Sequence, residues 1–163
     1  MNTVLDESTL NQINNAQFFM LRYETEFTPC TGITAVTRQE RRCFKHAVMI
    51  APWCPNLDCN KAEHDPLLSG KVKDSGWAFK VKGRNCHVLT TTDEHAPILF
   101  LAVAGRFQGV TTPYDLPLPA LREDTLYFGL AVDALLKAVG SPSQFVWGAD
   151  WESVPALHLV KKR

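Results

Sequence analysis

The chain has 163 residues, of which 45% are hydrophobic and 21% are charged, as in an ordinary globular protein of about one domain. Its 17 basic and 17 acidic residues cancel, which argues against a dedicated nucleic-acid-binding protein. We therefore expect a single globular domain over residues 1–163, and a domain of this length needs no metal or disulfide to fold.

The cellular compartment is predicted from the lack of a signal peptide and of a membrane-spanning segment in the sequence. The stretch MNTVLDESTLNQINNAQ has neither the basic segment nor the apolar run of a signal peptide. The longest apolar run, APILFLAVAG at 96–105, is too short to cross a bilayer. The cysteine count is five, and an odd number is unusual for a secreted disulfide scaffold. We expect a cytoplasmic protein with reduced thiols that does not enter membranes.

Two helices are predicted in the N-terminal part of the chain. Residues 5–23 show apolar residues near helical spacing, with Asp6 or Ser8 as N-cap, and residues 24–36 are expected to be loop. Thr37 opens a capping box, TRQE, which predicts a second helix that ends at Pro52. Its apolar side would bury Cys43, and its basic side would carry Arg38, Arg41, Arg42 and Lys45.

The middle and C-terminal parts are predicted to hold strands and one long helix. After a loop over 52–75 with Trp53 in the core, the segments 76–83, 86–91 and 97–105 are expected to be strands, and 106–112 is a candidate fourth. The strand over 97–105 is apolar on both faces and should be central. A helix over 122–139 should end at Gly140, and its Gly129 suggests a close neighbour. The tail is expected to form one or two short strands or loops around Trp147 and Trp151.

The order of these elements predicts the fold class. Strands that follow one another at hairpin spacing usually form an antiparallel sheet. We expect an α+β fold in which an antiparallel sheet of three to five strands packs against two N-terminal helices and one long C-terminal helix.

A metal site is one alternative. Cys54, Cys59 and His64 have four residues between successive members, at the loose edge of zinc-ligand spacing. The sequence has no CxxC pair, so we expect a metal-free loop and no cofactor. The alternative is a zinc-stabilised nucleic-acid- or protein-binding module, whose fourth ligand would be Cys43, His46, Cys86 or His87.

A small cysteine or acid/base enzyme is the other alternative. Cys30 lies in a predicted turn, and Cys86 and His87 should point to opposite faces of a strand. Asp93, Glu94 and His95 form either an acid/base cluster or a solvated turn, and the turn is the expected reading. No phosphate-binding loop, HExxH or GxSxG motif is present, which favours a non-enzymatic protein.

Two short segments resemble a known family. NNAQ at 14–17 and ERRCFKHAVM at 40–49 are similar, in the same order, to segments of the plasmid SOS-inhibition (PsiB) family. That family is non-enzymatic, is carried by mobile elements, and binds the recombinase RecA so that it does not load onto single-stranded DNA. The resemblance implies a protein that inhibits a host DNA-repair or defence protein by steric occlusion and so suppresses the SOS response.

The expected contact residues follow from the second helix. Arg38, Arg41, Arg42 and Lys45 are the predicted partner-binding residues, together with whichever of Trp53, Trp147 and Trp151 are exposed. Arginine suits bidentate contacts with carboxylates, and the neutral net charge favours an acidic protein partner over nucleic acid.

Overall fold

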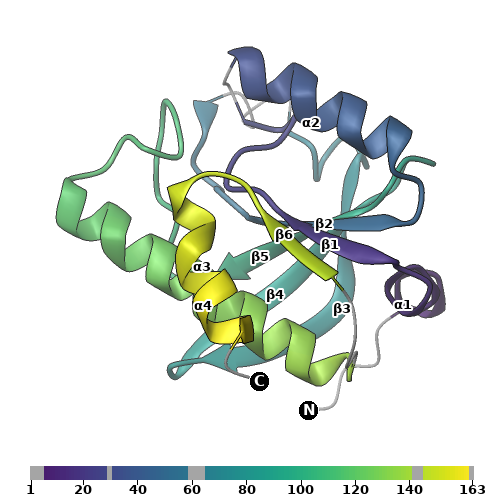
Figure 1. The fold of residues 1–163 in the computed structure, drawn as a ribbon. Coiled ribbons are helices and arrows are strands. Elements are labelled where there is room, and N and C mark those ends of the chain that lie inside the picture. The colour runs from purple at the N-terminus through teal and green to yellow at the C-terminus, as the bar shows by residue number, and fades with distance from the viewer. Residues whose placement is uncertain (1–5, 29–30, 59–64, 141–144, 162–163) are drawn as a thin grey trace.

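The computed structural model describes residues 6–28, 31–58, 65–140 and 145–161 of the chain (Figure 1). Helices and strands alternate at both ends of the described chain, and four strands follow one another between the second and the third α-helix. In chain order the elements are α1 (Glu7–Asn14), β1 (Phe18–Leu21), α2 (Thr31–Cys43), β2 (Ala47–Pro52), β3 (Val72–Val81), β4 (Arg84–Thr91), β5 (Ile98–Val103), α3 (Leu118–Ala138), β6 (Phe145–Gly148), the 3₁₀ turn η3 (Trp151–Ser153) and α4 (Val154–Lys161).

The strands form one six-stranded mixed sheet in the order β3-β4-β5-β2-β1-β6. Strands β3, β4 and β5 are antiparallel neighbours, as their hairpin spacing predicted. Strand β2 is parallel to β5 and β1, and β1 is parallel to β6. The mixture of helices and sheet is as expected. The prediction of an antiparallel sheet of three to five strands is wrong, because helical crossovers add a parallel half.

The first predicted helix stops early. Asp6 caps α1 by accepting a hydrogen bond from the Thr9 amide at 3.0 Å, as expected, but the helix ends at Asn14. The residues FFML that follow form β1, with Phe18 paired to Ala47. Their side chains are apolar on both faces of the sheet, a pattern that a short run cannot distinguish from a buried helix.

The second helix is shifted toward the N-terminus. It occupies Thr31–Cys43, where a loop was expected up to residue 36, and β2 occupies the positions predicted to be its second half. The Thr37 hydroxyl donates to the Ile33 carbonyl at 3.0 Å inside the helix, so TRQE is not a capping box. Pro52 ends strand β2 instead of a helix.

The C-terminal half agrees more closely with the sequence. Strand β5 lies inside the sheet, and α3 ends before Gly140, whose φ is 63°. A Cβ at Gly129 would lie 2.8 Å from the Ala156 nitrogen, so α3 and α4 do pack closely there. Residues 106–112 form no strand, and Gly105 makes a turn with φ 71°. None of the described helices is long and apolar enough to cross a membrane.

The sheet has an apolar cluster on each face, and the two are covered differently. One cluster joins alternate strand residues, such as Phe19, Ile50 and Leu99, to Phe128 and other apolar residues of α3. The opposite cluster contains Met20, Met49 and Phe100. Figure 1 shows α2 on that second side of the sheet, yet no described α2 residue belongs to either cluster. Helix α2 must therefore be attached to the domain by contacts other than apolar packing.

Candidate partner-binding surface

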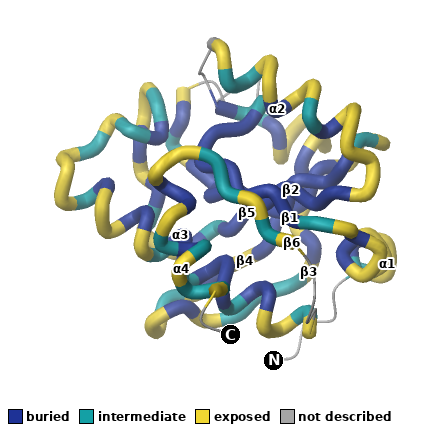
Figure 2. Tube along the Cα trace, in the orientation of Figure 1, coloured by how far each residue is buried: buried dark blue, intermediate teal, exposed yellow. Residues whose placement is uncertain are grey.

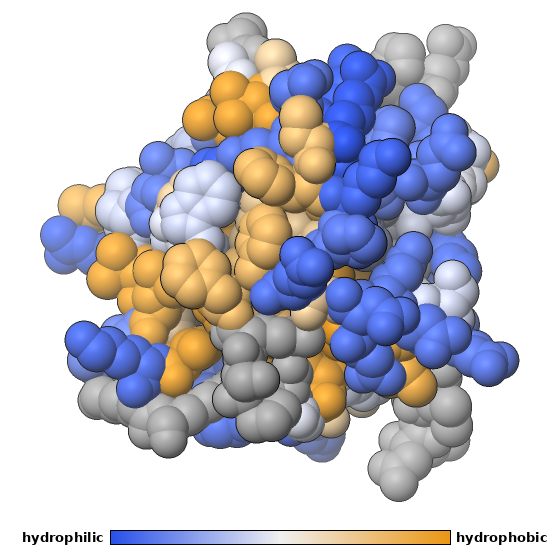
Figure 3. All heavy atoms as spheres, turned by 45° about the vertical axis from the view of Figure 1, so that its right-hand side comes forward, coloured by the Kyte–Doolittle hydropathy of each residue, from blue (hydrophilic) through white to orange (hydrophobic). Residues whose placement is uncertain are grey.

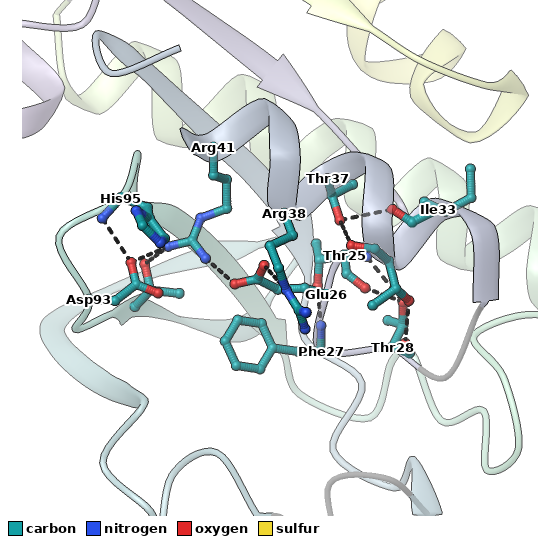
Figure 4. Close-up of polar contacts among 12 residues, drawn as sticks. Thr25, Glu26, Phe27, Thr28, Ile33, Thr37, Arg38, Arg41, Asp93 and His95 are labelled. Atoms are coloured by element: carbon teal, nitrogen blue, oxygen red, sulfur yellow. Dashed lines mark hydrogen bonds and ion pairs between the residues drawn. The ribbon is translucent and has the colours of Figure 1, made fainter. Parts of the chain in front are cut away.

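Arg41 attaches α2 to the domain. Its side chain is 0% exposed, although the sequence placed it on the basic outer side of the helix. The guanidinium forms ion pairs with Glu26, which precedes α2, and with Asp93 in the β4–β5 turn, the latter at 2.6 Å (Figure 4). Removing the guanidinium from water costs free energy, and the attraction of two carboxylates and further hydrogen bonds offsets much of that cost. Arg41 is therefore a structural residue, and its predicted place in an exposed binding surface is wrong.

Further hydrogen bonds fix the position of Arg41. Its Nε donates to the Ala96 carbonyl at 2.6 Å, and its own carbonyl accepts from the Ala96 amide at 3.2 Å. Nη2 donates to the Thr91 hydroxyl at 3.1 Å. These contacts join the last turns of α2 to the segment that leads into β5.

A second ion pair joins α2 to β1 and β6. Glu40 pairs with Arg22, which directly follows β1 and is 7% exposed. The Arg22 guanidinium also lies over the ring of Trp147 in β6, 5.0 Å from its centre, a cation–π arrangement. Arg41 thus attaches α2 to the β4–β5 turn, and Arg22 attaches it to β1 and β6.

The outer side of α2 carries Arg38 and Arg42, whereas Lys45 lies in the turn after the helix, so its predicted place on the helix is wrong. Arg42 and Lys45 are exposed, and neither has an ion-pair partner among the described residues. Arg38 is 55% exposed and lies 3.4 Å from Glu26, a surface pair of small energetic weight. We call Arg38, Arg42 and Lys45 the α2 basic surface.

A polar cleft of ≈ 600 Å³ adjoins the α2 basic surface. Lys45 and His46 line one side of it, and Glu94 and His95 of the β4–β5 turn line another. Ala47 and Pro97 also line the cleft, and the rest of its wall consists of exposed side chains of α1 and its C-cap: Glu7, Ser8, Asn11, Gln12 and Asn15. The cleft gives the surface a concave part into which a partner's polar side chain can fit.

The cluster Asp93, Glu94 and His95 forms a turn, as expected. The Asp93 carboxylate accepts from the His95 amide at 3.1 Å and pairs with Arg41 (Figure 4). Both contacts hold the turn in place, so the Asp93 carboxylate has a structural role. Glu94 and His95 are the members that face the cleft.

The cysteines of the described chain lie in different environments. Cys54 is 3% exposed in the core, whereas Cys59, His64 and Cys30 lie outside the described residues. Cys86 is buried and His87 exposed, as alternation predicted, and burial raises the pKa of the Cys86 thiol to about 12. No group of three potential metal ligands occurs among the described residues. Cys43 is exposed, so its predicted place in the core is wrong.

A separate acidic cluster lies in the core near the tail. Glu152 in η3 is 2% exposed and Glu24 after β1 is 8% exposed. The Tyr114 hydroxyl is within hydrogen-bonding reach of both carboxylates, and burial raises the pKa of Glu152 and of Tyr114. No arginine pairs with either carboxylate in the described chain, in contrast to Glu26, which precedes α2, and Glu40, which belongs to it.

Exposed apolar side chains form a patch that sequence reasoning only partly found. Trp147 and Trp151 are 40% and 51% exposed, whereas Trp53 is 7% exposed and packs in the core as predicted. Phe145, 69% exposed, and Phe44, 43% exposed, were missed. Phe145 pairs in register with Phe18, and the Phe18 ring meets that of Phe44 edge-on at 5.6 Å. Figure 3 shows apolar side chains gathered on this face, with hydrophilic ones beside them.

No protein-family model matches the chain, and no curated protein matches it. The resemblance to the PsiB family therefore stays a prediction that rests on two segments. The structure places NNAQ at the end of α1 and in the turn before β1, and ERRCFKHAVM from the end of α2 into β2. Both segments border the polar cleft, which is lined by Asn15 from the first and by Lys45 and His46 from the second.

Proposed function

We propose that this chain is a non-enzymatic protein that binds an acidic surface of a host protein through the α2 basic surface. It inhibits that partner by covering a region the partner needs. The observation that carries the proposal is the state of Arg42, in the last turn of α2, and of Lys45, two residues beyond its end. Both are exposed and unpaired in the described chain, and the opposite side of α2 is fixed by buried ion pairs.

The rigidity of α2 supports binding. A helix that is already held in place loses little conformational freedom when a partner docks, so more of the contact energy appears as affinity. Arg41 and Glu40 supply that rigidity without using any of the exposed basic side chains.

The charge distribution supports a protein partner. The formal net charge of the chain is zero, so the basic surface is a local feature of an otherwise balanced molecule. Local positive potential steers an acidic protein patch and fixes its orientation, whereas nucleic-acid binding usually needs a broader basic footprint.

The resemblance to PsiB makes RecA the candidate partner. The test is direct binding of purified RecA to the immobilised full chain, together with an assay of RecA loading onto single-stranded DNA. We expect saturable binding and slower loading in proportion to the chain added.

Capture experiments from bacterial lysate test the identity of the partner independently of the mode of binding. Recovery of a different acidic protein in place of RecA would keep the binding mode and reject the partner. Recovery of nucleic acid with no protein would contradict the proposal.

A further inference from the structure

The two outer edges of the sheet are built differently. Strand β3 forms one edge and carries the charged residues Lys73, Asp74 and Lys80, with a bulge between Asp74 and Trp77. Charges and bulges on an edge strand discourage pairing with another chain. Strand β6 forms the other edge within the described chain, and its residues FVWG include no charge and no proline.

Strand β6 is also open to solvent. Figure 2 shows it in exposed and intermediate colours, whereas β1 and β2 behind it are buried. Phe145 is 69% and Trp147 is 40% exposed, on the face of the sheet that carries α2. A short apolar edge of this kind is a template for addition of another strand.

The direction of the backbone groups of β6 follows from one hydrogen bond. The Ala149 amide donates to the Leu21 carbonyl in β1 at 3.2 Å. Because successive residues of a strand direct their amide and carbonyl groups to alternate sides, Trp147 faces β1 in the same way. The amide and carbonyl groups of Val146 and Gly148 therefore point away from the sheet.

We infer that β6 pairs with β6 of a second copy of this chain, antiparallel, about a two-fold axis that passes Trp147. Val146 then lies opposite Gly148 of the second copy, and the pair exchanges two backbone hydrogen bonds. The symmetric pair exchanges two more, so every outward-facing backbone group of the strand is used. Trp147 lies opposite its own counterpart.

This register is self-complementary. Each residue lies opposite one whose side chain is on the same face of the sheet. The α2 faces of the two sheets therefore form one continuous surface. The facing tryptophans occupy a non-hydrogen-bonded position, where opposing Cα atoms are only about 4.5 Å apart and aromatic pairs are most favourable. Arg22 covers one face of the Trp147 ring at 5.0 Å and leaves the rest of the ring for the second copy.

A second copy fits this edge better than a charged peptide. Nothing on Phe145–Gly148 carries a charge, so a peptide that bears charges finds no opposite charge on the strand and two identical strands do not repel one another. The zero net charge of the chain also removes long-range repulsion between copies. The α2 basic surface takes no part in this contact, so the inference does not depend on the proposed function.

Sedimentation equilibrium over a concentration series tests the dimer. We expect the mass of the full chain to rise from 18.2 kDa toward twice that value, with a dissociation constant of roughly 1–100 µM for so short a contact. Val146→Pro removes an amide that points only outward, so the fold should persist, checked by circular dichroism, while dimerisation weakens at least tenfold. Leu68→Glu is the control, because Leu68 is 81% exposed in the turn before β3 and its variant should dimerise normally.

A charge exchange tests the register. Because the axis places position 147 against itself, Trp147→Lys and Trp147→Glu should each be monomeric, and an equimolar mixture of the two should form a heterodimer. The paired variants Leu68→Lys and Leu68→Glu should each behave like the wild-type chain. A wild-type chain that stays monomeric up to about 1 mM, a Val146→Pro chain that dimerises normally, or a Trp147 mixture that stays monomeric would overturn the inference.

Discussion

Arg41 and Arg42 are neighbours in the sequence and belong to opposite sides of α2. Arg41 is fully buried among Glu26, Asp93 and the backbone of Ala96, whereas Arg42 is exposed and unpaired within the described chain. The inner side of the helix thus replaces apolar packing with ion pairs, and the outer side keeps its charge available. The contrast teaches that a run of basic residues on one helix can attach the helix through one member and leave the next one exposed.

Removing Arg41 is expected to give the largest effect on stability. Arg41→Met leaves Glu26, 9% exposed, without its main partner, and we expect a loss of about 3 kcal/mol in the free energy of unfolding. The matched control, Arg42→Met, should change it by less than about 0.5 kcal/mol. Urea unfolding of the three proteins measures both values. An equal loss in the two variants would remove the distinction between the two sides.

Glu40→Gln tests the second attachment of α2 and should have an intermediate effect. The change leaves Arg22 buried and charged without its carboxylate, and we expect a loss of about 1–2 kcal/mol. The exposed neighbour Gln39 supplies the control Gln39→Ala. Hydrogen exchange should show faster opening of α2 in the Glu40 variant alone; unchanged protection of α2 amides would argue that Arg22 does not hold the helix.

The acidic cluster near the tail allows a second comparison, because its carboxylates have no arginine partner in the described chain, unlike Glu26 and Glu40. Burial raises the pKa of Glu152 in the folded state above its unfolded value. Protonation of Glu152 therefore favours the folded state. This contribution to the free energy of unfolding is fully present below the pKa of the unfolded state and is lost as pH rises through the pKa of the folded state. We expect Glu152→Gln to gain stability relative to the wild-type chain as the pH is raised from 4 to 7, measured by urea unfolding at each pH. A difference that stays constant over this range would show that Glu152 does not titrate as described.

Reversing the charges of the outer side should have the smallest effect on stability. Arg42→Glu combined with Lys45→Glu removes no ion pair of the described chain, so the free energy of unfolding should change by less than about 0.5 kcal/mol. Lys71→Glu with Lys80→Glu, at the exposed edge of the sheet that β3 forms, makes the same change in net charge and likewise removes no ion pair of the described chain. A large loss confined to the α2 variant would mean that its outer side also carries structural contacts.

The sequence predicted the antiparallel half of the molecule better than the parallel half. Strands β3–β5 and helix α3 show clear periodicity and turn signals, and their positions were confirmed within a few residues. Strands β1 and β2 are short and apolar on both faces, so their patterns merged with the neighbouring helices. Their parallel pairing joins residues far apart in the chain, such as Leu99 and Ile50, which no local pattern records.

The candidate site was predictable in its location but not in its composition. The basic residues Arg38, Arg41 and Arg42 of α2 were identified, but helical spacing alone placed Arg41 on the outer side, where the structure has it buried. Only the long-range partner Asp93 and the preceding Glu26 distinguish Arg41 from Arg42, and neither is adjacent in sequence. Phe145 was missed because an edge strand of four residues gives almost no periodic signal.

The most direct test of the account is the affinity of purified RecA for the wild-type chain, for Arg42→Glu/Lys45→Glu and for Lys71→Glu/Lys80→Glu, measured at the same salt concentration. We predict equal affinity for the wild-type chain and the β3-edge variant, and at least tenfold weaker binding of the α2 variant, a loss of about 1.4 kcal/mol or more. Equal affinity of all three proteins would contradict the central claim that the outer side of α2 is the binding surface.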